Sequence, residues 1–207
     1  MHAPFSIEES LRFGWAKTRG HSAVLFPALL VIIAIQLLYS AASTVLGPSS
    51  VVGLTTMVVL AVLGIVAGLG YARLTLLLAQ GHRATLRDMM LPMHLVWHYA
   101  AASVLVVLMV VLGFIALIIP GVYLLVRFSM LRFLVLEGKG IMGSIRHSGP
   151  ITEGVKWRLL GFFLVVALLN ALGALLFLVG LLITVPITMV AYAHVYEKLK
   201  ARAGKKA

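Results

Sequence analysis

The sequence contains no cysteine and few charged residues. Of its 207 residues, 11% are charged and only 6 are acidic. The absence of cysteine excludes disulfides, thiolate metal sites and cysteine nucleophiles. The shortage of acids leaves little material for carboxylate catalysis. An ordinary soluble domain is about one quarter charged, whereas this chain is 62% apolar. A water-soluble globule and a disordered tail are therefore both excluded.

Long apolar runs dominate what is present. A helix needs roughly 20 mostly apolar residues to cross a bilayer, and no run alternates as barrel strands do. The sequence therefore predicts an all-α integral membrane fold, a single transmembrane domain over 1–207 with six transmembrane helices arranged as three hairpins. The predicted spans are 22–46, 51–80, 96–119, 120–138, 157–179 and 180–197.

The basic residues orient these spans. All of the 17 Lys and Arg except Arg73, Arg127 and Arg132 lie in the N-terminal arm, the 81–95 and 138–158 connectors or the C-terminal tail. The three opposite turns carry no charge. Because basic loops stay in the cytoplasm, we expect cytoplasmic N- and C-termini. The net charge of +11 suits anionic headgroups of membrane lipids. It does not indicate a nucleic-acid partner, because there is no basic patch on a soluble fold.

Each hairpin has an amphipathic leader on the cytoplasmic side. Residues 5–18 open with Ser6-x-x-Glu9, a capping-box pattern typical of a helix start, and the apolar residues that follow share one face. We expect an interfacial helix there. Thr85-x-x-Asp88 predicts a second such helix, continuing at helical spacing toward the third span. A weaker amphipathic pattern occupies the third connector. The sequence leaves open whether the three units are a true internal repeat.

The three tryptophans stand near the predicted ends of spans or leaders. They are Trp15, Trp97 and Trp157. Because tryptophan is enriched where the bilayer meets water, we expect all three to be interfacial anchors.

Arg127 is the most informative charged residue. It lies seven residues past Pro120, which places it roughly 10 Å below the outer surface. An arginine inside a membrane is a functional hypothesis that needs a partner. Gln36 and Asn170 lie at similar depth, roughly 15 Å from the outer face. We therefore predict a buried polar centre of Arg127, Gln36 and Asn170. It would hold helices together, bind a lipid or solute, or contact another subunit.

Arg73, Arg132 and His194 also fall within spans. Each is within a few residues of a cytoplasmic end, from which a long basic side chain can reach the headgroups. We expect these residues to extend toward the interface.

Two spaced pairs complete the candidates. Gly64-x-x-x-Gly68 allows close helix approach, within the bundle or in a dimer. His94-x-x-x-His98 has a spacing that suits metal ligation, but nothing nearby completes a ligand set. We therefore expect an interfacial histidine pair, with no metal and no cofactor. The sequence also lacks a phosphate-binding loop, a nucleophile elbow and a paired-carboxylate arrangement. An enzyme is not expected.

The stretch 120–161 carries a recognisable series of motifs. They are Pro120-Gly121-x-Tyr123, Arg127-Phe128-Ser129, Glu137-x-Lys139-Gly140, Ser144-Ile145-Arg146-x-Ser148 and Gly154-x-x-Trp157-Arg158-Leu159. This series resembles the YciC-like bacterial inner-membrane proteins and the related membrane domain fused to some glycerophosphodiester phosphodiesterases. The resemblance implies a multi-pass protein of the bacterial inner membrane without chemistry of its own, with a link to lipid or envelope maintenance.

These observations favour a non-enzymatic accessory or structural subunit of a membrane complex, or an envelope or lipid-maintenance factor. Its expected partners are membrane lipids and other membrane protein subunits, or a second copy of the chain. The alternative is a small transporter or exporter that uses the polar site around Arg127.

Overall fold

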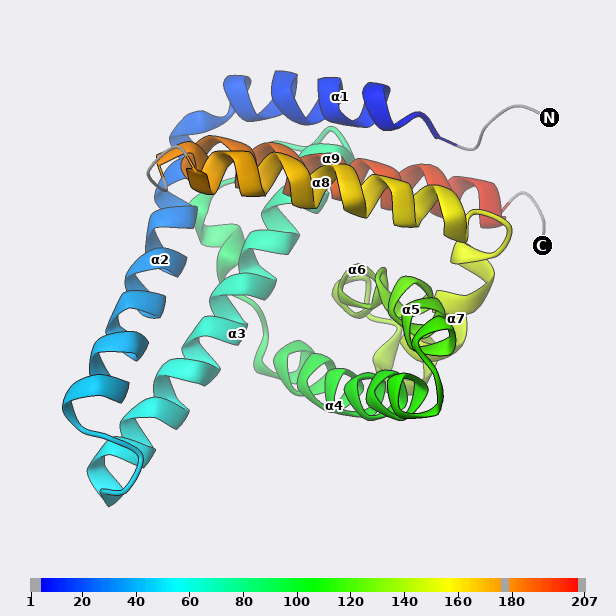
Figure 1. The fold of residues 1–207 in the computed structure, drawn as a ribbon. Coiled ribbons are helices and arrows are strands. Elements are labelled where there is room, and N and C mark those ends of the chain that lie inside the picture. The colour runs from blue at the N-terminus through cyan, green and yellow to red at the C-terminus, as the bar shows by residue number, and fades with distance from the viewer. Residues whose placement is uncertain (1–4, 176–178, 205–207) are drawn as a thin grey trace.

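The computed structural model describes residues 5–175 and 179–204 (Figure 1). Every secondary-structure element in these ranges is helical. The elements are α1 (Ile7–Gly20), α2 (Ser22–Val45), α3 (Val51–Ala79), the 3₁₀ helix η1 (Leu86–Met89), α4 (Met93–Ala116), α5 (Ile118–Phe128), α6 (Leu131–Leu136), α7 (Gly140–Thr152), α8 (Lys156–Leu175) and α9 (Val179–Gly204).

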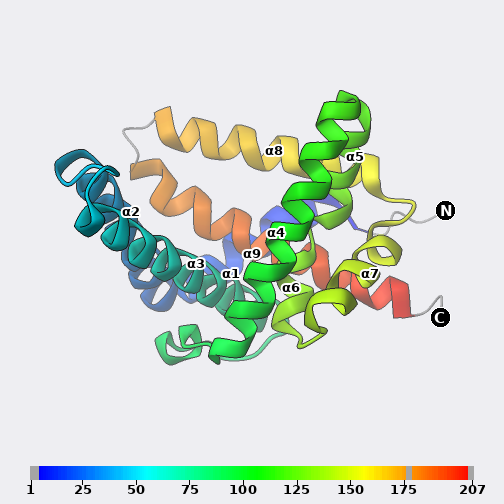
Figure 2. The ribbon, with the colours of Figure 1, turned by 90° about the horizontal axis from the view of Figure 1, so that it is seen from below.

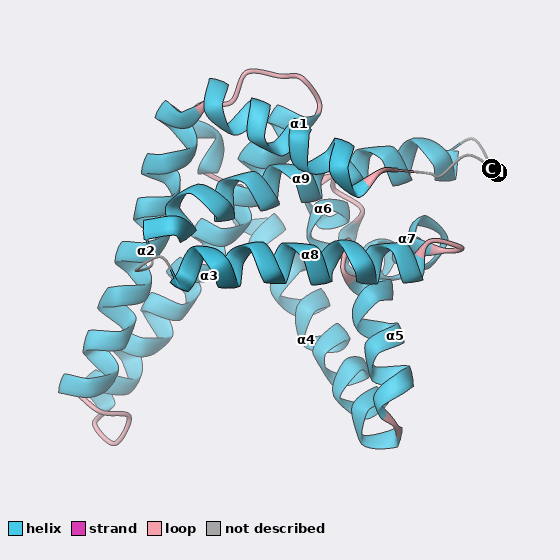
Figure 3. Ribbon diagram, turned by 45° about the horizontal axis from the view of Figure 1, so that its top comes forward, coloured by secondary structure: helices cyan, strands magenta, loops and turns pink. Residues whose placement is uncertain are grey.

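Six stretches of the described chain are long and apolar enough to cross a membrane. They are α2, α3, α4, α5 together with α6, α8 and α9. The predicted all-α, six-span membrane fold is confirmed, and the chain is a multi-pass membrane protein. Successive spans pack as the hairpins α2–α3, α4–α5 and α8–α9, while α9 also contacts α1 and α3. Figures 2 and 3 show the α2–α3 and α4–α5 hairpins leaving the centre of the molecule in different directions.

The apolar core lies at one end of the hairpins, next to the charged connectors. In α2 the buried residues are Leu25, Ala28 and Leu29, near its start. In α3 they lie mainly from Ala67 onward, and in α9 from Pro186 onward. The largest fully buried side chains include Leu74, Phe133, Phe162 and Tyr196. We call this packed end of the molecule the base.

The opposite ends of the hairpins, here called the tips, are largely exposed. Val45 and Val51 are 81% and 80% exposed, and Ile119 and Leu175 are 81% and 78% exposed. Each hairpin packs on itself, but the three hairpins contact one another at the base. In water such bare apolar surface would be unstable, so these faces belong against lipid or another membrane protein.

Glycines permit the close approach of helices within two hairpins. A methyl group on Gly121 would lie 2.4 Å from the ring of Phe114, and one on Gly180 would lie 2.4 Å from the carbonyl oxygen of Gly173. Because Cβ atoms do not fit at such distances, glycine is needed at Gly121 and Gly180. In both hairpins, α4–α5 and α8–α9, a glycine therefore allows the two helices to approach closely.

The leaders follow the prediction in two of three cases. Helices α1 and α7 form where amphipathic helices were expected. The prediction of a helix for the second leader was wrong. Only the four residues of η1 are helical, and Met90 is extended. Pro92 explains the break, because proline lacks an N–H donor and disfavours helical geometry in the residue before it. Thr85 and Asp88 still form the predicted cap, with the Thr85 amide donating to Asp88 Oδ2 at 2.8 Å.

The predicted fourth span is not one continuous helix. Helix α5 ends at Phe128 and α6 begins at Leu131. The Phe133 amide donates to the Met130 carbonyl, one residue later than α-helical spacing requires. The carbonyl of Ser129 is thereby freed, and the Tyr192 hydroxyl of α9 donates to it. This contact lets the chain break inside an apolar segment without leaving a backbone acceptor unsatisfied.

Candidate functional site

The three members of the predicted polar centre have separate neighbours. Arg127, near the end of α5, lies against α7: a methyl group on Gly149 would be 3.2 Å from its Nη2. The Arg127 Nε is buried without a hydrogen-bond partner. None of the ion pairs among the described residues includes Arg127. Its guanidinium thus packs between two helices at the base.

Asn170 links the two helices of the third hairpin. Its Nδ2 donates to Thr188 Oγ1 of α9 at 3.4 Å, while its Oδ1 is buried without a partner. The Thr188 hydroxyl in turn donates to the Thr184 carbonyl at 2.9 Å. For Asn170, the contacts favour the helix-joining alternative that the sequence left open.

Gln36 lies in a different place again. The sequence predicted a buried side chain, but Gln36 is exposed in the single chain. It lines a cavity of about 500 Å³. Helices α2, α3, α4, α6 and α9 all contribute to the wall. The polar residues of this wall are Gln36, Tyr39, Tyr71, Tyr99 and Arg132. The structure therefore places Gln36 and Arg132 in the wall of one cavity, and neither Arg127 nor Asn170 lines it.

Arg132, which the sequence predicted to extend toward the interface, lies in the wall of this cavity. It is half-buried, its Nη1 lies 3.9 Å from Met189 Sδ, and its Cζ lies 5.9 Å from the Tyr192 ring centroid. Thioether sulfur is a weak acceptor, and no carboxylate of the described residues pairs with Arg132. The break at Ser129 separates α6 from α5. The sequence predicted one continuous span there, so it indicated only that Arg132 lies near the end of a span.

Tyr71 supplies a second unpaired polar group at the same cavity. The residue is 3% exposed, and its hydroxyl is buried with no hydrogen-bond partner among the described residues. A buried hydroxyl without a partner is costly. The Tyr71 side chain belongs to the wall of the Arg132 cavity, with its hydroxyl covered by the surrounding described residues.

Gly64 and Gly68 also line this cavity. A methyl group on Gly68 would have no neighbour within 4 Å, and one on Gly64 would lie 3.9 Å from Ile35 Cγ2. Neither glycine is needed for close packing within the described chain. Here the pair leaves space beside α3, and its role in a dimer stays a prediction.

The three tryptophans and His94 are exposed, and His98 is half-buried. Trp15, Trp97 and Trp157 are 51%, 66% and 88% exposed, which leaves them free to meet an interface. The rings of His94 and His98 stand 6.0 Å apart, edge to face. Within the described residues, no group of three or more His, Asp or Glu is placed to hold a metal ion.

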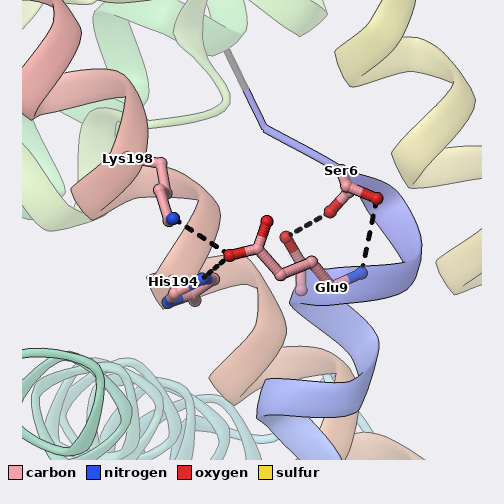
Figure 4. Close-up of polar contacts among 5 residues, drawn as sticks. Ser6, Glu9, His194 and Lys198 are labelled. Atoms are coloured by element: carbon pink, nitrogen blue, oxygen red, sulfur yellow. Dashed lines mark hydrogen bonds and ion pairs between the residues drawn. The ribbon is translucent and has the colours of Figure 1, made fainter. Parts of the chain in front are cut away.

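A polar latch joins α1 to α9 (Figure 4). Glu9 Oε1 lies 3.0 Å from Lys198 Nζ and 3.9 Å from His194 Nε2. The hydrogen bond from Lys198 lowers the pKa of Glu9. Ser6 caps α1 as expected, accepting from the Glu9 amide at 3.5 Å. The Glu9 carboxylate, however, reaches across to α9. His194 Nε2 is buried without a hydrogen-bond partner among the described residues, and its ring stacks on Phe13 with 4.0 Å between ring centroids.

Comparison of the chain with known protein families, with curated proteins and with solved structures finds no match. The fold and the site therefore define a class only, that of a six-helix multi-pass membrane protein with a mainly apolar cavity whose wall includes Arg132.

Proposed function

We propose that the protein is a non-enzymatic accessory subunit whose tips pack against other components of a membrane complex. The observation that supports this role is the contrast between base and tips. The base holds the clusters of buried apolar residues, whereas Leu37, Leu112 and Leu172 on the three hairpins are 65%, 65% and 51% exposed. A subunit with diverging apolar hairpins offers large faces for neighbouring helices.

The setting we propose is the bacterial inner membrane, with both termini in the cytoplasm. The distribution of Lys and Arg supports the orientation. The motifs over 120–161 support membership of the YciC-like group. If the protein instead maintains the envelope or its lipids, the tips would contact lipid rather than another protein.

The test is a tagged chain extracted gently from its own membrane, with co-purifying proteins and lipids quantified by mass spectrometry. The cysteine-free chain allows a photo-crosslinker to be placed at Leu112→Cys on a tip. Met142→Cys on α7, exposed to 58%, is the matched control away from the tips. A protein crosslinked at Leu112 but not at Met142, and recovered in a near-integer ratio, supports the subunit role. Recovery of lipid alone at both positions would contradict it.

A second candidate function is a small transporter or exporter. It is favoured by one observation, the cavity that joins Gln36 to Arg132, rather than by the Arg127 site predicted from the sequence. This candidate requires the cavity to open to both sides of the membrane. Cysteines at Tyr39 and Tyr99 that react with an impermeant thiol reagent from opposite sides would support it, and reaction from one side only would contradict it.

A further inference from the structure

We propose that the Arg132 cavity binds the anionic group of an amphiphilic molecule, with the apolar part of the molecule along α2 and α3. The anionic group is the carboxylate of a fatty acid or the phosphate of a phospholipid, since both present charged oxygens to a guanidinium. This site does not depend on the accessory role proposed above.

The first argument is charge. Arg132 lies inside an apolar segment and has no carboxylate partner in the described chain. All 6 acidic residues of the sequence belong to the described part, and those in ion pairs contact other cations, namely Arg12, His194, Lys198 and Lys200. A charge near lipid is costly unless it is paired or reaches water. An anion from outside the chain would supply the pairing.

The second argument is hydrogen bonding. The amide of Gln36 lines the wall that includes Arg132. An amide N–H can donate hydrogen bonds, so the cavity combines a cation with a neutral donor. That combination suits an acceptor-rich anion.

The third argument is the rest of the wall. Leu29, Ile32, Leu60, Ile65 and Val185 are among its apolar members. The volume of about 500 Å³ falls in the range of roughly 300–1,000 Å³ that is usual for ligand sites. A small inorganic anion would leave this apolar surface uncovered, whereas an acyl chain would cover it. The occupant is therefore amphiphilic.

The fourth argument concerns space. Gly68 faces open volume where any other residue would place a side chain. A Cβ at this position meets no described atom within 4 Å, so a larger side chain would begin in open space and extend into the cavity that Gly68 lines. Gly68→Leu is consequently a blocking variant that is expected to keep the fold, because leucine is also the better helix former.

The experiment measures binding of defined probes to the purified full chain, stripped of lipid in a neutral detergent. The probes are oleate, dioleoyl phosphatidylglycerol, dioleoyl phosphatidylcholine and inorganic phosphate, followed by native mass spectrometry and thermal shift. We expect oleate or phosphatidylglycerol to bind, and Arg132→Gln to weaken that binding about tenfold, the loss expected for a charge-assisted hydrogen bond. Gly68→Leu should abolish binding.

Matched controls separate a site from general effects. Arg73→Gln removes another half-buried cation of a span that does not line the cavity. Gly20→Leu adds the same side chain in α1, where Gly20 also has no neighbour within 4 Å. Neither control should change binding. If Arg132→Gln fails to fold, the comparison of Gly68→Leu with Gly20→Leu still decides the matter.

The probes also distinguish the outcomes. Preference for oleate assigns a fatty-acid carboxylate, and preference for phosphatidylglycerol assigns a phospholipid phosphate. Equal binding of phosphatidylcholine, tight binding of inorganic phosphate alone, or unchanged binding in Gly68→Leu would each overturn the proposal. None of these results bears on whether a protein crosslinks at Leu112, so the two proposals fail separately.

Discussion

Glu9 near the start of α1 and Lys198 near the end of α9 form an ion pair, with 3.0 Å between Oε1 and Nζ (Figure 4). The two residues are 189 positions apart in the sequence. Helix α1 lies along α9 and approaches it closely at Gly14, where a methyl group would lie 2.4 Å from the Ile187 carbonyl oxygen. The amphipathic leader is thus docked on a spanning helix as well as exposed on its other side.

Replacing Glu9 with Gln should loosen α1 from α9, because the amide loses its charge-assisted contact with Lys198. The expected result is faster hydrogen exchange in α1 with little change elsewhere, since exposed ion pairs contribute modestly. Glu8→Gln is the control, because Glu8 pairs with Arg12 of the same helix. Equal acceleration of hydrogen exchange in both variants would show that the Glu9–Lys198 contact does not hold α1 on α9.

Acid should release the same latch. The Glu9 pKa is lowered from 4.5 by the Lys198 contact, so the carboxylate is more acidic in the folded chain. A lowered pKa stabilises the docked state above pH 4.5, and this stabilisation is lost as the pH falls through the folded pKa. Fluorescence of Trp15 followed from pH 7 to 3 should change in the wild type. The change should be absent in Glu9→Gln, and its persistence there would assign it to another group.

Gly14→Ala should destabilise the docking of α1 by about 1–3 kcal/mol, as overpacking usually does. The added methyl would meet the backbone of α9, which cannot turn aside. Gly20→Ala is the matched control in the same helix, where nothing lies within 4 Å. Thermal unfolding in detergent compares the two. A Gly14→Ala protein as stable as the control would refute the close approach.

Tyr192→Phe should cost about 1 kcal/mol, because the Ser129 carbonyl at the break between α5 and α6 would lose its donor. Tyr71→Phe in the lipid-free protein is the control, since the Tyr71 hydroxyl has no partner to lose. Denaturation in mixed micelles measures both changes. Equal stability of the two variants would mean that the break is satisfied by another group.

Single cysteines should report the orientation of the hairpins. Ser49, in the turn between α2 and α3, is exposed, as is His82 in the connector that follows α3. In intact cells an impermeant thiol reagent should label Ser49→Cys. His82→Cys should react only after the membrane is permeabilised. The reverse pattern would contradict cytoplasmic termini.

Some of these features could be predicted from particular residues. The capping residues Ser6, Thr85 and Asp88 were identified correctly because a cap depends on neighbours within four positions. The prediction that the helix continues after Asp88 was wrong. The apolar residues there have helical spacing, but Pro92 interrupts the helix. Arg132 was expected at the interface, because depth along a helix does not reveal which helices surround a side chain.

The sequence by itself determined that this protein is helical and crosses a membrane six times, because each span must satisfy its own backbone hydrogen bonds within the apolar run. Tertiary structure alone decided which polar groups meet. Helix–helix packing in a membrane depends on small residues and a few hydrogen bonds rather than on burial of apolar surface, so apolar periodicity carries little information about partners. The break at Ser129 and the glycines of α3 bring Arg132, Gln36 and Tyr71 to one cavity, while Asn170 joins α8 to α9.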